Sequence, residues 1–214
     1  MGVPVLILGE SGSGKSASLR NFSPEEVGIF NVAGKPLPFR KKLPSVNTSD
    51  YNAIKHGIAK RTRKTYVIDD AQYLMCFESF AKAKESGYGK YTDMALHFYD
   101  LVQFVIQQTA PDVIVYFLQH TEQDGNTGKI KAKTLGKMLD SQLTLEGLFS
   151  IVLLCDANER GHFFQTQSNG YTTCKSPMEM LPPTMENDLK AVDTAIRDYY
   201  EMNKKETENH DSQA

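Results

Sequence analysis

The sequence predicts a single α/β domain with a doubly wound, mainly parallel sheet and helices on both faces. Three observations support this fold class. The 214 residues lie within the length of about 250 at which single domains begin to split. Short β-branched apolar runs alternate with segments of helical spacing, as in sheets covered by helices. The first run, Val3–Leu8, is apolar throughout, which is typical of a strand buried on both faces.

Five segments have the composition of buried strands. The first ends at Gly9, and Pro4 lies near its start, where a missing backbone donor is tolerated. The other four strands are expected at residues 27–32, 65–68, 113–118 and 150–154.

Five further segments have the apolar spacing of helices. Ser49 and Asp50 offer an N-cap to the second of them, and Pro111 ends the fourth. The helices are expected at residues 15–21, 51–60, 72–84, 92–109 and 187–201.

Two irregular stretches and a late β-hairpin complete the expected domain. Residues 33–48 contain three prolines and several cations, so we expect a long ordered loop there, and residues 124–140 form the second irregular stretch. The Asn169-Gly170 pair predicts a hairpin between residues 163–167 and 171–173. The domain is expected to span residues 1–203, followed by a polar, frayed tail over 204–214.

Composition and charge limit the class of protein. Hydrophobic residues make up 40%, charged residues 23%, and the net charge is −2, which indicates a globular protein in which any nucleic-acid contact is a local patch. No apolar run approaches the roughly 20 residues of a membrane span, and residues 1–8 are too short for a secretory signal. We therefore expect a cytoplasmic protein without a membrane partner. Cys76, Cys155 and Cys174 lack disulfide or zinc spacing, so we interpret them as reduced packing residues.

A phosphate-binding motif follows the first strand. Residues 9–16 read GESGSGKS and match GxxxxGK[ST] between a strand and a helix, the context that supports a P-loop. Its backbone N–H groups would surround the β-phosphate, Lys15 would reach the β- and γ-phosphates, and Ser16 would ligate Mg²⁺. A glycine-rich turn that matches by chance is the alternative. The nucleotide-binding residues expected are Gly9, Glu10, Ser11, Gly12, Ser13, Gly14, Lys15, Ser16 and Ala17.

Two aspartates follow the third expected strand, as in a Walker B element. Asp69 would hold Mg²⁺ through its water shell, and Asp70 would orient or deprotonate the attacking water. The alternative is that both side chains cap the helix that starts near Gln72.

Several segments resemble the phage-encoded AAA-type nucleotide-binding family, which is related to the RecA-like single-strand-annealing ATPases of phage recombination modules. The resemblance covers the chain up to about Tyr200. It implies a RecA-like P-loop core with sheet order 5-1-4-3-2, ATP and Mg²⁺ as ligands, and a homo-oligomer. It also implies a role on single-stranded DNA beside a phage single-strand-binding protein, in the host cytoplasm. The segments are residues 31–39 (NVAGKPLPF), 118–122 (LQHTE), 146–149 (EGLF), 175–177 (KSP) and 187–189 (NDL).

The resemblance also suggests a γ-phosphate sensor, while one feature departs from RecA. RecA-like ATPases carry a polar sensor at the tip of the strand that ends here in Gln119, with His120 as the second candidate. Either residue can instead be an ordinary loop residue. RecA has a catalytic glutamate after its second strand, whereas this chain has NVAG at residues 31–34. Hydrolysis would then depend on Asp70 or be slow.

Basic residues supply candidate contacts to DNA and to a neighbouring subunit. The DNA-contact candidates lie in a stretch, residues 125–139, that contains no acid. A solvated lysine-rich loop is the alternative. By analogy with RecA-like assemblies, Lys175 or Arg160 could reach a neighbouring subunit's γ-phosphate. The DNA-contact candidates are Lys129, Lys131, Lys133 and Lys137.

Three functions are consistent with these features. The first is an ATPase that acts as an oligomer on single-stranded DNA in recombination, annealing or replication. The second is a nucleotide-gated switch that recruits a helicase, packaging motor or host factor. The third is a P-loop kinase, which would need an arginine-rich lid, and only Arg160 and Arg197 follow residue 63.

Overall fold

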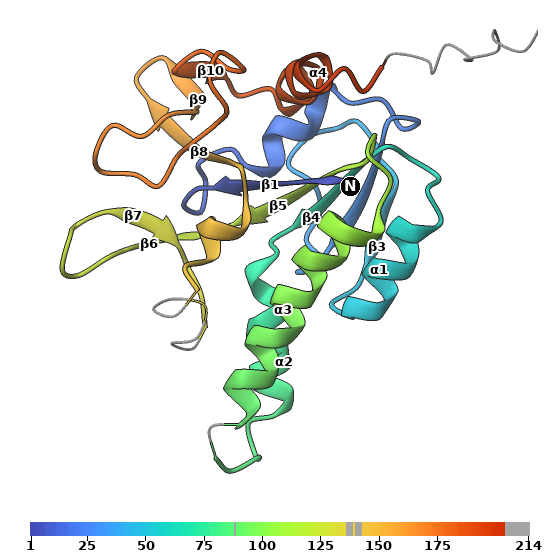
Figure 1. The fold of residues 1–214 in the computed structure, drawn as a ribbon, viewed down its shortest axis with the longest axis vertical. Coiled ribbons are helices and arrows are strands. Elements are labelled where there is room, and N and C mark those ends of the chain that lie inside the picture. The colour runs from blue at the N-terminus through green and yellow to red at the C-terminus, as the bar shows by residue number, and fades with distance from the viewer. Residues whose placement is uncertain (88, 136–138, 140–142, 204–214) are drawn as a thin grey trace, which may run out of the picture.

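A computed structural model describes residues 1–87, 89–135, 139 and 143–203 (Figure 1). Its centre is an eight-stranded sheet in the order β10-β9-β8-β1-β5-β4-β2-β3. The six strands from β8 to β3 in this order are parallel to one another. Strand β9 is antiparallel to β8 and to β10. The bounds are β1 (Val3–Leu8), β2 (Val27–Asn31), β3 (Ser45–Asn47), β4 (Thr65–Asp69), β5 (Ile114–Gln119), β8 (Ile151–Asn158), β9 (Gly161–Gln165) and β10 (Thr184–Glu186).

The expected α/β class with a mainly parallel sheet is confirmed, but the full eight-strand order differs from the five-strand order 5-1-4-3-2. The five expected strands correspond to β1, β2, β4, β5 and β8, which lie side by side as β8-β1-β5-β4-β2, and three further strands extend the sheet at both edges. One of them, β3, lies inside the stretch 33–48 that we expected to be a loop. Its three residues are all exposed, so no apolar pattern marks this edge strand in the sequence.

The late hairpin is present, but the expectation that it turns at Asn169-Gly170 is wrong. The hairpin joins β8 to β9 through a turn that closes at the pair Asn158 and Gly161. The other edge of β9 pairs with β10, for example Phe164 with Met185, so no edge of β9 is left for residues 171–173. Asn169-Gly170 instead forms a local turn in which the Ser168 hydroxyl accepts from the Gly170 N–H at 3.2 Å.

The second irregular stretch contains part of an antiparallel ribbon. Strand β6 (Thr121–Gln123) pairs with β7 (Ile130–Ala132). The turn between them is held by Asp124, whose Oδ1 accepts from the backbone N–H groups of Asn126 at 3.0 Å and Thr127 at 2.8 Å. The ribbon leaves the main sheet directly after β5.

The helices cover both faces of the sheet. Leu6 and Leu8 pack with side chains of α1, α2 and α3, whereas Val5 and Ile7 point to the opposite face and pack with η1 and α4. Helices α2 and α3 lie side by side and project from the body of the protein (Figure 1). The helix bounds are η1 (Ser16–Asn21), α1 (Tyr51–Ala59), α2 (Gln72–Ala81), α3 (Gly89–Gln108), η3 (Leu145–Leu148) and α4 (Leu189–Tyr199).

The expected helices are present, with local differences at their ends. The one after the glycine-rich loop is a 3₁₀ helix, and Asp50 caps α1 by accepting from the N–H groups of Asn52 and Ala53. Within the described ranges, no helix combines the length and the apolar character that crossing a membrane would require. The expected tail, residues 204–214, lies outside the described residues.

Candidate functional site

A pocket of about 310 Å³ lies at the carboxyl ends of the parallel strands, the edge where α/β sheets usually bind ligands. Six of the nine expected nucleotide-binding residues line it, whereas Gly9, Glu10 and Ser13 do not. Asp69, Asp70 and His120 also line it, so residues from three neighbouring strands meet here as predicted. The lining residues from the glycine-rich loop are Ser11, Gly12, Gly14, Lys15, Ser16 and Ala17.

The glycine-rich loop needs its glycines for two different reasons. Gly12 and Gly14 have φ angles of +82° and +101°, which favour glycine because L side chains are strained there. At Gly9, an added Cβ would lie 2.4 Å from Ser13 Oγ and 2.7 Å from the Cys155 carbonyl oxygen. The loop therefore packs too closely against β8 to admit even a methyl group at Gly9.

Side chains from the far end of the chain fix the shape of this loop. The Ser13 carbonyl accepts from Cys155 Sγ at 3.0 Å and from His162 Nδ1 at 2.8 Å, and the Gly14 carbonyl accepts from Asn187 Nδ2 at 3.3 Å. These three residues belong to β8, β9 and the approach to α4. No motif marked Cys155 and His162 in the sequence, and Asn187 was noted only in the segment 187–189 that carries the resemblance. Their role depends on contacts across more than 140 positions.

Lys15 is buried and folded back onto its own loop. Its ammonium group donates to the carbonyl oxygens of Gly9 at 2.6 Å and Glu10 at 2.8 Å. Burial lowers the pKa of Lys15, although the nearby Asp70 and Asp69 oppose that shift. The ammonium group thus lies at the pocket, held by neutral acceptors that a phosphate oxygen can replace.

Ser16 and Asp69 both line the pocket and contact each other. The Ser16 hydroxyl donates to Asp69 Oδ1 at 2.8 Å, joining the start of η1 to the end of β4. Burial raises the pKa of Asp69, and the Ser16 hydrogen bond works in the opposite direction. Among the described residues, no group of three or more His, Cys, Asp and Glu side chains could hold a metal ion. One hydroxyl and one carboxylate nevertheless form a donor set that suits Mg²⁺ bound together with phosphates.

Asp70 is held between two basic side chains. Lys35 Nζ donates to its Oδ2 at 2.8 Å, and His120 Nε2 lies 3.3 Å from its Oδ1. Burial by itself would raise the pKa of Asp70, but the hydrogen bonds of His120 and Lys35 outweigh it and the pKa is lowered. Asp70 has a φ of +60°, which aspartate and asparagine adopt more readily than most residues.

The alternative that these aspartates only cap the following helix is wrong. The N-cap position of α2 is Ala71, and no side chain makes a capping hydrogen bond there. Both carboxylates are instead directed into contacts at the pocket, with Ser16, Lys35 and His120.

The two sensor candidates differ in position. Gln119 is fully buried, and its Nε2 donates to the Lys133 carbonyl at 2.7 Å. It does not line the pocket, whereas His120 does. His120, the first residue after β5, therefore faces the pocket. Gln119, the last residue of β5, instead connects this strand to the segment after β7.

The DNA-contact candidates follow the β6–β7 ribbon. Lys131 Nζ lies 3.5 Å from Asp124 Oδ2 and 3.7 Å from Glu122 Oε1, so acids from the ribbon's own turn and opposite strand partly balance its charge. Lys129 and Lys133 are exposed, and Lys137 lies outside the described residues. Lys131 of the acid-free stretch is thus paired with acids that precede this stretch in the chain.

The candidates for contacts with a neighbouring subunit do not line the pocket either. Arg160 is exposed in the β8–β9 turn. Lys175 pairs with Val152 through two backbone hydrogen bonds of 2.8 and 2.9 Å, which place it near the start of β8. Whether either residue acts on another subunit stays a prediction.

Sequence reasoning missed four residues of the pocket, namely Lys35, Pro36, Pro38 and His162. The first three lie in the loop after β2, which reaches the site because β2 neighbours β4 in the sheet. Their proximity follows from strand order, and only the resemblance in residues 31–39 drew attention to this segment.

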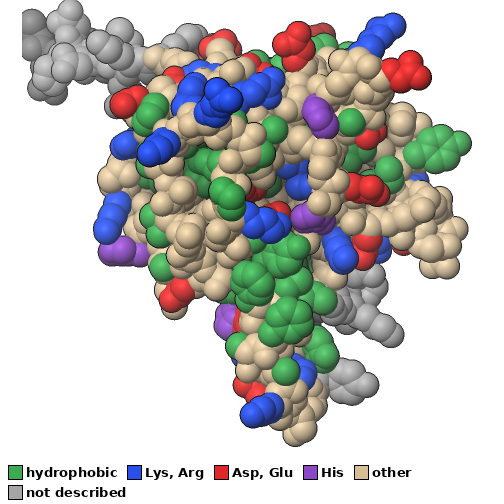
Figure 2. Space-filling model, turned by 180° about the vertical axis from the view of Figure 1, so that it is seen from behind, with side chains coloured by type: hydrophobic (Ala, Val, Ile, Leu, Met, Phe, Trp, Pro, Cys, Tyr) green, Lys and Arg blue, Asp and Glu red, His purple; other side chains and the backbone are tan. Residues whose placement is uncertain are grey.

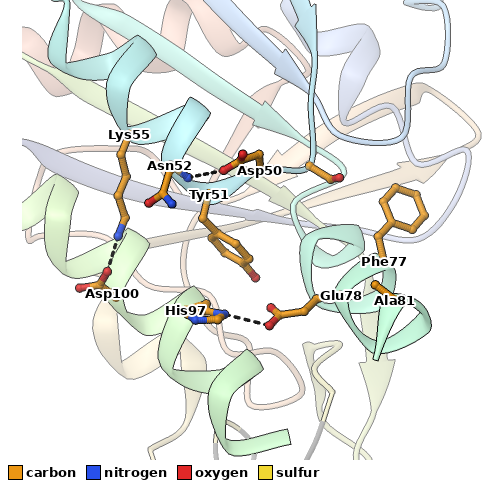
Figure 3. A pocket seen from close by; sticks show the side chains of 10 residues that line it. Asp50, Tyr51, Asn52, Lys55, Phe77, Glu78, Ala81, His97 and Asp100 are labelled. Atoms are coloured by element: carbon orange, nitrogen blue, oxygen red, sulfur yellow. Dashed lines mark hydrogen bonds and ion pairs between the residues drawn. The ribbon is translucent and has the colours of Figure 1, made fainter. Parts of the chain in front are cut away.

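A second pocket, of about 390 Å³, lies among α1, α2 and α3 (Figure 3). Among its charged lining groups, Lys55 pairs with Asp100, and Glu78 Oε1 pairs with His97 at 2.9 Å. Glu78 Oε2 and the Tyr51 hydroxyl are buried without a hydrogen-bond partner among the described residues. Asp50 caps α1. None of the expected site residues lines this pocket, so we assign the candidate site to the glycine-rich loop.

No protein-family model matches this chain, and no curated protein matches its sequence. The function proposed for it therefore rests on the geometry of the site and on the motifs.

Proposed function

We propose that the chain binds ATP with Mg²⁺ at this pocket, in a RecA-like P-loop core, and hydrolyses it. One observation carries the proposal: the loop after β1 brings the Lys15 ammonium group and the Ser16 hydroxyl beside Asp69, with Ser16 Oγ 2.8 Å from Asp69 Oδ1. A P-loop requires these three groups around a metal-bound triphosphate.

The residues of the pocket suit both ligands. The positive φ angles of Gly12 and Gly14 let the backbone curve as a phosphate-binding loop does. Lys15 would exchange its two carbonyl acceptors for phosphate oxygens. Ser16 and Asp69 would turn their oxygens toward Mg²⁺, directly or through water, and the ion would neutralise charge on the phosphates.

Asp70 is the carboxylate placed to orient the attacking water, because it lines the pocket beside Asp69. It is also hydrogen-bonded by Lys35, and its low pKa makes it a weak base. We therefore propose that Asp70 positions water more than it removes a proton, which is consistent with slow hydrolysis in the absence of a partner.

We further propose that the protein works as an oligomer on single-stranded DNA, beside a phage single-strand-binding protein. The β6–β7 ribbon supports a link between the two ligands, because it continues directly from β5. The Lys133 N–H donates to the His120 carbonyl at 2.9 Å, so movement of His120 at the pocket would be transmitted to the lysine-bearing segment.

A coupled assay tests this function. Purified protein should hydrolyse ATP only when Mg²⁺ is present, and an unstructured oligonucleotide should raise the rate. Removing Mg²⁺ with EDTA and adding it back is the control for a contaminating activity. ATP hydrolysis that single-stranded DNA leaves unchanged would support the ATPase and argue against the DNA role. The absence of both nucleotide binding and hydrolysis would contradict the proposal.

Replacing the lysines in and beside the β6–β7 ribbon, namely Lys129, Lys131 and Lys133, with alanine should weaken binding to single-stranded DNA. Removal of each lysine that contacts a phosphate should make the slope of log affinity against log salt shallower by about 0.7. Because Lys131 is already paired with acids, we expect Lys129→Ala and Lys133→Ala to contribute more than Lys131→Ala. Titrations of labelled oligonucleotide at several salt concentrations, with and without ATP, measure this, and ATP affinity should not change.

A nucleotide-gated recruitment switch is the second candidate, and the exposed face of α2 favours it. Phe80 is 74% exposed, and the Tyr73 and Phe77 rings stack with centroids 5.5 Å apart. Tyr73 also contacts the His120 ring edge-on, so this apolar strip begins at the pocket. Figure 2 shows hydrophobic side chains gathered on the projecting part of the molecule. A variant defective in DNA binding that still recruits a protein partner in an ATP-dependent manner would favour this candidate.

A further inference from the structure

Lys35 is a second lysine at the phosphate pocket, and the glycine-rich motif does not include it. It follows Gly34, whose φ is +67°, and its carbonyl accepts from Asn31 Nδ2 at 2.5 Å. These two features turn the loop after β2 toward the end of β4. The ammonium group thereby reaches Asp70 at 2.8 Å and lies 5.1 Å from the centroid of the Tyr73 ring.

The two lysines approach the pocket from opposite sides. Lys15 comes from the loop after β1 and Lys35 from the loop after β2, while β4, which carries Asp69 and Asp70 at its end, lies between these strands in the sheet. Among the described residues that line the pocket, there is no arginine. The permanent positive charges available to a ligand there are these two ammonium groups.

The present partner of Lys35 can be exchanged. Its side chain is 60% exposed, and ion pairs of such exposed groups contribute little to stability because water and salt screen them. A terminal phosphate carries more negative charge than one carboxylate and offers three acceptor oxygens. It would therefore compete well for this cation.

We propose that Lys35 contacts the terminal phosphate of ATP from within the same chain and stabilises the charge that develops during its transfer. This inference rests on the proposed ATPase function. In that reaction the water oxygen forms a bond to the terminal phosphorus, the bond to the bridging oxygen breaks and leaves its electron pair on ADP, and the water proton departs with phosphate or solvent. Lys35 keeps its proton throughout and acts by charge. When the triphosphate binds, Lys35 exchanges Asp70 for the terminal phosphate, and His120 stays as the basic neighbour of Asp70.

Affinities for ATP and ADP separate this role from a general effect on the pocket. Lys35→Met keeps the length of the side chain and removes its charge. It should weaken binding of a non-hydrolysable ATP analogue about tenfold and leave ADP affinity unchanged, since ADP lacks the terminal phosphate. Turnover should fall about 100-fold, as when one donor to a transition-state oxyanion is removed. Lys35→Arg, which keeps the charge, should retain much of the ATP-analogue affinity and of the turnover. Lys42→Met, which replaces an exposed lysine of the same loop, should behave as wild type.

The Asp70→Asn background tests whether Lys35 acts only by holding Asp70. A direct phosphate contact predicts that Lys35→Met still weakens ATP-analogue binding in that background, whereas a purely positioning role predicts no further loss. Equal losses of ATP-analogue and ADP affinity would overturn the inference and leave the ATPase proposal intact. Failure of the wild-type protein to bind either nucleotide would overturn both. Thermal unfolding of each variant, with Lys35→Gln as a second neutral replacement, identifies any loss that comes from misfolding.

Discussion

Replacing Lys15 with methionine should abolish tight ATP binding and turnover while the protein stays folded. Truncating one member of a buried, hydrogen-bonded charge pair costs about 2–5 kcal/mol, which weakens binding roughly 30-fold or more. Because Lys15 reaches the β- and γ-phosphates in the proposed complex, both ADP and ATP affinity should fall. Fluorescence titration with a labelled nucleotide and Mg²⁺ measures the change.

Stability is the control for the Lys15→Met variant. Methionine cannot make the hydrogen bonds to the Gly9 and Glu10 carbonyls, each worth about 1.5–3 kcal/mol because the donor is charged. The substitution also removes a charge that burial disfavours, since burial lowers the pKa of Lys15, and the loss of that cost offsets part of the destabilisation. We expect the free energy of unfolding in urea to fall by at most about 3 kcal/mol. A folded variant that binds and hydrolyses ATP as the wild type does would show that this loop is not the nucleotide site.

Asp70→Asn should lower turnover far more than ATP affinity. A group that orients water acts mainly in the transition state, so kcat should fall by about 100-fold or more while KM stays within a few-fold. Asparagine is nearly the same shape and tolerates the φ of +60° at this position, so the backbone should be kept. Steady-state hydrolysis rates over a range of Mg²⁺-ATP concentrations give both constants.

The matched comparison for Asp70→Asn is Asp69→Asn, on the preceding carboxylate. That variant should raise the Mg²⁺ concentration needed for binding, because Asp69 contacts Ser16 at the proposed metal position. If Asp70→Asn reduced affinity and turnover equally, Asp70 would belong to metal binding or to the structure of the pocket. Unchanged kcat would remove it from the reaction.

Local sequence determined the parts of this protein that local chemistry specifies. The glycines and Lys15-Ser16 after an apolar strand, the two acids at the end of β4 and the Asp50 cap of α1 all depend on neighbours within a few positions, and each lies where the pattern predicted. The expected strands and helices also exist, because period and burial are properties of each segment.

Only the tertiary structure decided which distant residues complete the site. His162 and Asn187 bind the glycine-rich loop across 149 and 173 positions, and Lys35 meets Asp70 because β2 lies beside β4. The strand paired with β9 and the acids opposite Lys131 were decided in the same way. Hydrogen bonds and ion pairs depend on distances of a few ångströms between atoms, and those distances are set by strand order and register. Neither leaves a pattern within a single segment of the chain.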